Sequence, residues 1–342
     1  MNSLERVNRV LEHGIPDRVP VALHNFLMAG TFIGCSDLSA MLQDGNLMAE
    51  AQIKAWEYLQ HDVIQIENGV IVLAQALGCK VVYPRNEPPH VTEAVLKDLN
   101  MLDKIELPEP EKTFPLNEII KATEIVSRKL GKDVFIVGRA DQGPMALAAA
   151  IYGVERLLRD ITDPDKEEQI NHLLDFCSKC NIVYGLAHKR AGAHATCIGG
   201  YGLSIISPAT YRKYELPCEK KFVYEIKNQG MKAFIHICGK EDTILQDMVG
   251  TGADTLELDP LTQPLLAKKF ARGKTTLLGF MDPIEIAKGT PVSIRERCRE
   301  IIEILAIGGG FILSPGCALP IDTPAENVKA MVDAAKEYGV YK

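Results

Sequence analysis

The sequence predicts a (β/α)8 barrel of the TIM type, preceded by an N-terminal helix. The chain has 342 residues, a length that suits one large α/β barrel. Short apolar runs alternate with longer stretches of helical periodicity. Most of these runs are apolar throughout, as expected for parallel strands covered by helices. The predicted strands are 19–24, 62–67, 134–139, 195–199, 232–238, 254–259, 275–280 and 310–314. A doubly wound parallel sheet is the alternative, but no glycine-rich dinucleotide loop follows the first predicted strand.

The helices follow from apolar side chains at helical spacing. The first covers 2–13, where Leu4, Val7 and Leu11 recur on one face, and Pro16 follows its end. The later predicted helices are 40–60, 116–130, 165–191, 208–229, 241–251, 293–307 and 324–338.

One stretch departs from the alternation. Residues 68–115 are rich in proline and polar residues, as in YPRNEPPHV, with an extra strand predicted over 79–83. We interpret 68–115 as an insertion or lid after the second strand. The prediction is one domain over 1–342 that carries this insertion.

Composition narrows the functional class. The chain has 38 Lys and Arg against 45 Asp and Glu, a net charge of −7. Nucleic-acid binding needs a basic face, so it is not expected. No apolar run approaches the roughly 20 residues that span a bilayer, and the charged N-terminus lacks the apolar centre of a signal peptide. We therefore expect a cytoplasmic protein without a membrane partner. Its nine cysteines would then be mostly free thiols, with any functional ones acting as metal ligands or nucleophiles.

Three metal-ligand side chains fall at predicted strand ends, where barrel enzymes carry their chemistry. His236 and Cys238 are two residues apart on one strand, so both point to the same side. Cys317 follows the last strand after a Pro-Gly turn. One imidazole and two thiolates suit zinc, and three protein ligands leave a fourth position open for catalysis. A His-x-Cys pair can also be ordinary packing, which is the alternative for this motif.

Two carboxylates follow on the next strand. Glu257 and Asp259 share a strand face, so either is a candidate displaceable fourth ligand or a catalytic acid or base. A salt bridge at the barrel rim is the alternative.

Other strand ends supply candidate substrate contacts. The loop after the first strand is apolar and could line a small substrate, with ordinary barrel-end packing as the alternative. The candidate substrate-binding residues are His24, Phe26, Met28, Arg139, Tyr201 and Asp282.

Two segments resemble a known family. HICGKEDTILQDMVGTGADTLELD (236–259) and FILSPGCALPIDTPAENVKAMVDAAKEYG (311–339) are similar to the uroporphyrinogen decarboxylase superfamily, and most similar to its methylcobamide:coenzyme M methyltransferase branch. LERVNRVLEHGIPDRVPV, SPATYRKYELP and GFMDP add weaker similarity along the chain.

The resemblance implies a (β/α)8 barrel and a catalytic zinc held by His236, Cys238 and Cys317, one zinc per chain. It also implies a methyl group moved between a corrinoid (cobalamin) protein and a small molecule. That molecule is either a thiol such as coenzyme M or a methoxylated or otherwise methylated compound. This chain has no Asp-x-His-x-x-Gly segment of the kind that carries a corrinoid, so the corrinoid is expected on a separate small protein. The branch has a glutamate near the position of Asp259, where this chain has the shorter aspartate.

Two other functions stay open at this stage. The superfamily's decarboxylases place arginines just after the first strand to hold substrate carboxylates, but HNFLMAGTFIG (24–34) contains no lysine or arginine. Uroporphyrinogen decarboxylation is therefore the weaker alternative. A corrinoid-binding module without turnover is the other.

Overall fold

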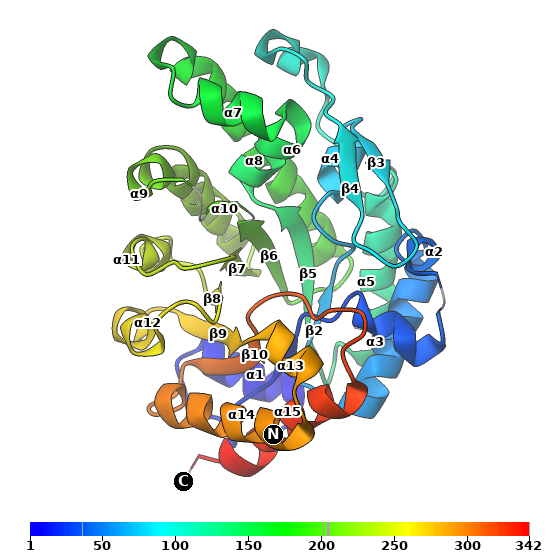
Figure 1. Cartoon of the computed structure of the whole chain (residues 1–342), viewed down its shortest axis with the longest axis vertical. Coiled ribbons are helices and arrows are strands. Elements are labelled where there is room, and N and C mark those ends of the chain that lie inside the picture. The colour runs from blue at the N-terminus through cyan, green and yellow to red at the C-terminus, as the bar shows by residue number, and fades with distance from the viewer. Residues whose placement is uncertain (36, 201, 204–205, 342) are drawn as a thin grey trace.

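The computed structural model describes residues 1–35, 37–200, 202–203 and 206–341. Eight parallel strands form one sheet in the order β1-β2-β5-β6-β7-β8-β9-β10, and a parallel bridge between Val21 and Leu313 joins its first and last strands. The fold is thus the predicted (β/α)8 barrel, with helices outside the strands (Figure 1). The barrel strands are β1 (Ala22–Leu23), β2 (Val63–Ile66), β5 (Phe135–Gln142), β6 (Ala195–Gly200), β7 (Lys232–Ile237), β8 (Thr255–Leu258), β9 (Thr276–Met281) and β10 (Phe311–Pro315).

The helices surround the barrel and supply the outer core. The α-helices are α1 (Ser3–Leu11), α2 (Leu38–Met41), α3 (Gly45–Leu59), α4 (Val72–Ala76), α5 (Leu116–Leu130), α6 (Pro144–Tyr152), α7 (Val154–Asp160), α8 (Glu167–Arg190), α9 (Pro208–Thr210), α10 (Leu216–Asn228), α11 (Leu245–Val249), α12 (Pro264–Ala271), α13 (Pro283–Lys288), α14 (Pro291–Leu305) and α15 (Ala325–Tyr338). Short 3-10 helices are η1 (Met28–Ile33), η2 (Leu99–Lys104) and η3 (Pro164–Lys166), and η5 (Tyr211–Glu215) is a π-helix before α10.

Helix α1 covers the N-terminal end of the barrel. Its Val7, Val10 and Leu11 are buried and belong to one apolar cluster with inward side chains of the strands, including Phe135 and Phe234. This cluster fills the lower part of the barrel interior. The opposite end, where the strands finish, is left for polar side chains.

The predicted strands coincide with the observed ones to within a few residues. Sequence reasoning missed α6 and α7 after β5, and α12 and α13 after β8 and β9. The sequence of α6, PMALAAAIY, is apolar on all sides, so it has no helical period to detect. The helix predicted over 241–251 is only α11.

Residues 68–115 contain α4, η2 and a separate two-stranded antiparallel sheet of β3 (Lys80–Val82) and β4 (His90–Glu93). β3 matches the extra strand predicted over 79–83. The backbone N–H of Leu96 donates to the carbonyl of Ile151 (2.8 Å), which ties this segment to α6. That the segment acts as a lid, and that the chain is a single domain, stay predictions.

Within the part of the chain that the structure describes, no helix is both long enough and apolar enough to cross a membrane.

Candidate metal centre at the C-terminal end of the barrel

The structure brings the three predicted metal ligands together. His236 lies in β7, Cys238 directly after it, and Cys317 two residues beyond the end of β10. The His236 Nε2 atom is 3.1 Å from the Cys238 sulfur, which is 3.7 Å from the Cys317 sulfur. All three ligand atoms lie within 4.8 Å of one another, and no other described residues form such a group of three. His236 is buried, and the two cysteines are half-buried.

A glycine lets Cys317 reach this position. At Gly316 a Cβ atom would lie 2.4 Å from the Cδ atom of Pro260 and 3.1 Å from the carbonyl oxygen of Leu258. The turn after β10 therefore passes too close to the end of β8 for any side chain. The Pro-Gly spacing before Cys317 is the local signal of this close approach.

The imidazole of His236 is oriented for a ligand at Nε2. Its Nδ1 atom lies 3.1 Å from the backbone carbonyl of Glu257, which accepts the Nδ1 proton. A histidine that donates one ring N–H to a carbonyl presents the lone pair of its other nitrogen, the arrangement usual for metal-bound histidines. The hydrogen bond with Cys238 lowers the pKa of Cys317. That same contact, together with burial, raises the pKa of Cys238, so Cys317 is the first of the pair to ionise.

A buried ionic network lies behind the ligands. Arg139 Nη1 is 2.6 Å from Glu257 Oε2, and Arg139 Nε is 3.2 Å from Glu67 Oε2. Gln65 accepts from Arg139 (2.7 Å) and donates to Glu257 (2.8 Å), and His24 pairs with Glu67. Burial by itself would raise the pKa of Glu257, but the charge of Arg139 lowers it. Arg139 was predicted to contact the substrate, and in the structure its guanidinium is paired with the carboxylates of Glu67 and Glu257.

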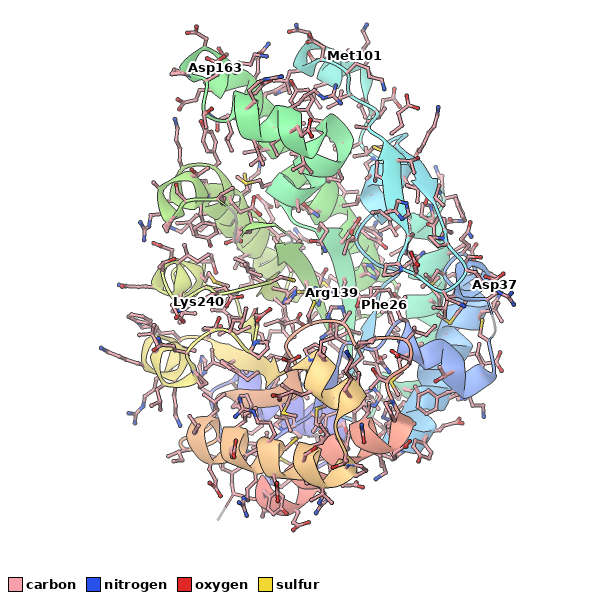
Figure 2. All side chains as sticks on the ribbon, viewed as in Figure 1. Phe26, Asp37, Met101, Arg139, Asp163 and Lys240 are labelled. Carbon is pink, nitrogen blue, oxygen red and sulfur yellow. The ribbon has the colours of Figure 1, made fainter. Side chains whose placement is uncertain are left out.

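Sequence reasoning did not assign a role to Glu67 or Gln65. Both belong to the second strand region, two residues apart, so they face the same side. The alternation that places Phe135 and Val137 in the apolar lower core also places Arg139 above them, at the polar end. Figure 2 shows Arg139 near the centre of the molecule. The sequence signal that could have revealed this network is a glutamine and a glutamate on the same face of an otherwise apolar strand.

Asp259 lies beside the ligands without joining their cluster. Its Oδ2 accepts from the backbone N–H of Gly239 (3.0 Å), and its Oδ1 accepts from that of Leu261 (2.9 Å). It therefore holds the turn that follows Cys238. Glu257 is closer to the imidazole, with Oε2 3.8 Å from His236 Nδ1.

The remaining predicted contacts are distributed around the barrel end. The His24 ring centroid is 6.1 Å from that of His236 and 6.0 Å from that of Phe26. Met28 is fully buried in the core. Asp282 is the N-cap of α13 and accepts from the N–H of Ile284 (2.7 Å). Tyr201 lies outside the described residues.

An apolar cleft of about 700 Å³ opens beside the metal ligands. Its walls come from α6, α7 and the β3–β4 segment, and Cys238 and Gly239 stand at one end. Sequence reasoning missed this cleft because both wall helices were missed.

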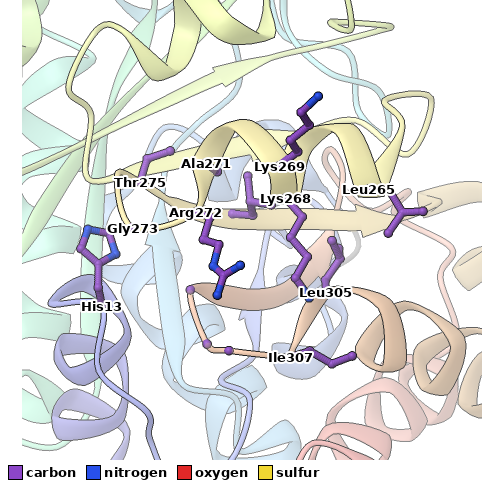
Figure 3. Close-up of a pocket in the computed structure, with 14 residues that line it drawn as sticks. His13, Leu265, Lys268, Lys269, Ala271, Arg272, Gly273, Thr275, Leu305 and Ile307 are labelled. Atoms are coloured by element: carbon purple, nitrogen blue, oxygen red, sulfur yellow. The ribbon is translucent and has the colours of Figure 1, made fainter.

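A second pocket, of about 600 Å³, lies at the other end of the barrel, by the starts of β9 and β10 (Figure 3). In Figure 3 Lys268 extends toward Leu305, whereas Lys269 points away from it. Lys268 donates to the carbonyl of Ile304 (2.7 Å). Lys268 and Lys269 stand in the last turn of α12, where cations offset the helix dipole. This pocket is separate from the metal centre.

Comparison with known proteins agrees with the geometry. The sequence model of the uroporphyrinogen decarboxylase (URO-D) family matches residues 2–338. The chain belongs to the URO-D family. Similar family members include the methylcobamide:CoM methyltransferase MtbA of Methanosarcina acetivorans, 28% identical over 98% of this chain and 97% of that protein. The methylcobamide:CoM methyltransferase MtaA of Methanosarcina barkeri is 29% identical over 85% of this chain and 84% of that protein.

A solved structure has the same architecture. A methyltransferase from Methanosarcina mazei superposes with a TM-score of 0.88 at 25% sequence identity, covering 99% of both chains. The resemblance inferred from residues 236–259 and 311–339 is therefore confirmed at the level of family and fold.

Proposed function

We propose that this URO-D family member is a zinc-dependent methyltransferase that moves a methyl group between a corrinoid protein and a small molecule. The observation that carries the proposal is the cluster of His236, Cys238 and Cys317 at the C-terminal end of the barrel. The relatives named methylcobamide:CoM methyltransferases support the same class of reaction.

The donor set fits zinc. One imidazole and two thiols are borderline-soft ligands, and three of them leave the fourth position for an exchangeable ligand. When bound, zinc would keep a substrate thiol as thiolate at neutral pH or polarise a substrate oxygen. Two thiolates and one neutral imidazole already cancel the zinc charge, so a bound substrate thiolate would stay electron-rich. This favours a thiol acceptor over a polarised oxygen.

The surrounding residues position the ligands. The carbonyl of Glu257 holds the ring of His236, and Asp259 holds the turn after Cys238. The positive charge of Arg139 balances the negative charges of Glu257 and Glu67 inside the barrel. The Glu257 carboxylate, which lies near His236, therefore stays ionised.

The corrinoid comes from a partner in this proposal. The chain lacks an Asp-x-His-x-x-Gly segment, so a small corrinoid protein would dock over the end of the barrel where the ligands lie. In the transfer to a thiol, a sulfur lone pair forms the S–C bond as the Co–C bond breaks. The electron pair of the Co–C bond stays on cobalt, and the thiol proton is released.

The test uses zinc-loaded full-length protein with methylcobalamin as a soluble substitute for the partner. We expect zinc-dependent loss of methylcobalamin absorbance on addition of a thiol, with a methyl thioether formed in equal amount. Cys317→Ala is expected to abolish it, and Cys35→Ala, a half-buried cysteine outside the cluster, is expected to leave it unchanged. If neither methylcobalamin with thiols nor cob(I)alamin with methyl ethers reacts on zinc-loaded enzyme, the proposal is wrong.

A further inference from the structure

The proposed reaction does not yet use the apolar cleft beside Cys238. Its volume of about 700 Å³ lies within the roughly 300–1,000 Å³ typical of small-molecule sites. Methyl transfer itself needs only a sulfur or oxygen atom at the metal, so most of this space is available to the rest of the substrate. The cleft adjoins the ligand set, because Cys238 is one of its lining residues.

The walls of the cleft are almost wholly apolar. Helix α6 contributes Met145 and Ala149, helix α7 contributes Val154 and Leu158, and the β3–β4 segment contributes Val91. Val154 is 50% exposed and Leu158 37% exposed, so both present apolar surface to solvent. A ligand with an apolar body would cover them, and each covered apolar surface contributes to binding.

No lysine or arginine is placed to receive an anionic substrate there. Among the described residues that line the cleft, His90, an exposed residue of β4, is the only basic side chain, and the sequence has no lysine or arginine at 201 or 204–205. The guanidinium of Arg139 is engaged by Glu67 and Glu257. Lys240, on the other side of Cys238, is largely exposed and lies 3.5 Å from Asp242. A sulfonate or carboxylate entering the cleft would lose water without gaining a lysine or arginine partner, which is unfavourable.

We infer that the substrate of this site is an uncharged molecule with an aromatic or branched apolar body. It occupies the cleft between α6, α7 and β4, and its sulfur or oxygen reaches the metal at Cys238. The inference rests on the proposed methyltransferase function and deepens it by substrate class. It excludes a small thiol that carries a sulfonate as the preferred substrate.

A corrinoid is the other occupant to consider. Its macrocycle is rimmed with amide groups, which need hydrogen-bond partners, and the described cleft offers few polar side chains. The apolar lining therefore favours the small substrate over the corrinoid. Displacement of a bound thiol by a corrinoid would show the opposite.

The experiment compares two thiols on zinc-loaded full-length protein by titration calorimetry with proton release recorded. Phenylmethanethiol is uncharged and apolar, and 2-mercaptoethanesulfonate carries a fixed negative charge. We expect phenylmethanethiol to bind at least about tenfold more tightly, a difference of about 1.4 kcal/mol. Equal affinities, or tighter binding of the sulfonate, would overturn the inference.

The two proposals fail in different ways. Proton release on binding reports thiolate formation at the metal and tests the methyltransferase proposal. The ratio of the two affinities tests the cleft. If both thiols bind without zinc-dependent proton release, the proposed function fails, and the affinity ratio still decides the substrate class. If neither thiol binds, both proposals are wrong. If cobinamide displaces phenylmethanethiol, only the assignment of the cleft to the substrate is wrong.

Charge placed in the cleft provides the matched variants. Ala146→Lys adds a cation to the α6 wall, and Val154→Lys adds one at the more exposed rim, so at least one should fold. Each is expected to move the affinity ratio about tenfold toward the sulfonate while zinc content stays at one per chain. Val292→Lys, on an exposed residue of α14 outside the cleft, is the control and should leave the ratio unchanged. Unchanged ratios in both folded cleft variants would contradict the assignment.

Discussion

The guanidinium of Arg139 lies 2.6 Å from the carboxylate of Glu257, although 118 positions separate the two residues in the chain. They stand on β5 and β8, which are not neighbours in the sheet, and meet across the barrel interior. Both side chains are buried. The pair therefore joins opposite walls of the barrel directly behind the metal ligands.

Arg139→Gln should destabilise the protein strongly. It leaves Glu67 and Glu257 buried without their cation, and loss of one partner of a buried ion pair typically costs about 3–5 kcal/mol. Urea unfolding measures the change. Arg128→Gln, which breaks an exposed pair with Glu124 on α5, is the control and should unfold like the wild type. Equal midpoints for the two variants would show that Arg139 is not essential to the barrel interior.

One zinc per chain should depend on each ligand separately. Cys238→Ala and Cys317→Ala are expected to lose most of the bound metal because two remaining ligands hold zinc weakly. Elemental analysis after gel filtration gives the stoichiometry, and circular dichroism should show an unchanged fold. Cys35→Ala should keep a full equivalent. A full equivalent of zinc in both ligand variants would refute the assignment.

Asp259→Asn should slow methyl transfer while most of the zinc stays bound. The side chain holds Gly239 and Leu261 through two backbone N–H groups, and an asparagine can accept from only one of them with its oxygen. Loss of an outer partner of a metal site typically costs about 10–100-fold in affinity or activity. X-ray absorption and the rate with methylcobalamin are the readouts. Unchanged rate and coordination would reduce Asp259 to a residue of the barrel rim.

Asp141 predicts a pH dependence of stability. It is buried with φ of 65°, and desolvation raises the pKa of its carboxyl from 3.8 to about 7. Between these values the folded protein holds a proton that the unfolded chain has lost, so stability falls as pH rises through this window. Within this window, the free energy of unfolding is expected to fall by about 1 kcal/mol for each pH unit.

Asp141→Asn isolates this contribution. Asparagine tolerates positive φ and can still accept from the N–H of Leu73, which Asp141 binds at 2.7 Å. Unfolding free energies at pH 5 and pH 8 should differ less in the variant than in the wild type. A difference of the same size in both proteins would show that Asp141 does not titrate in this range.

Uroporphyrinogen decarboxylation should be absent. Residues 24–34 contain no lysine or arginine, and Arg139 is paired with two carboxylates, so the carboxylates of uroporphyrinogen would be desolvated without these charge partners. Anaerobic incubation with uroporphyrinogen and chromatography of the products test this. Formation of coproporphyrinogen at a useful rate would reinstate decarboxylation as the function.

The sequence by itself determined the features that depend on local periodicity. Alternating apolar runs and helical spacing predicted all eight barrel strands, and the two-residue spacing of His236 and Cys238 placed both on one strand face. The glycine before Cys317 marked a close turn, and the structure shows the close approach to Pro260 that leaves no room for a side chain there.

Only the tertiary structure decided what meets across the barrel. Period-two alternation says that Arg139 and Glu257 point inward, but closure of the sheet, which is a long-range event, makes them partners. Cys317 likewise reaches Cys238 only because β10 curls back toward the end of β7 in the closed barrel. The apolar cleft had no sequence signal, since α6 is apolar on every side and its helical period cannot be read. Local interactions therefore determine the strands, the helices and the placement of His236 and Cys238 on one strand face. Closure of the barrel determines which residues meet to form the site.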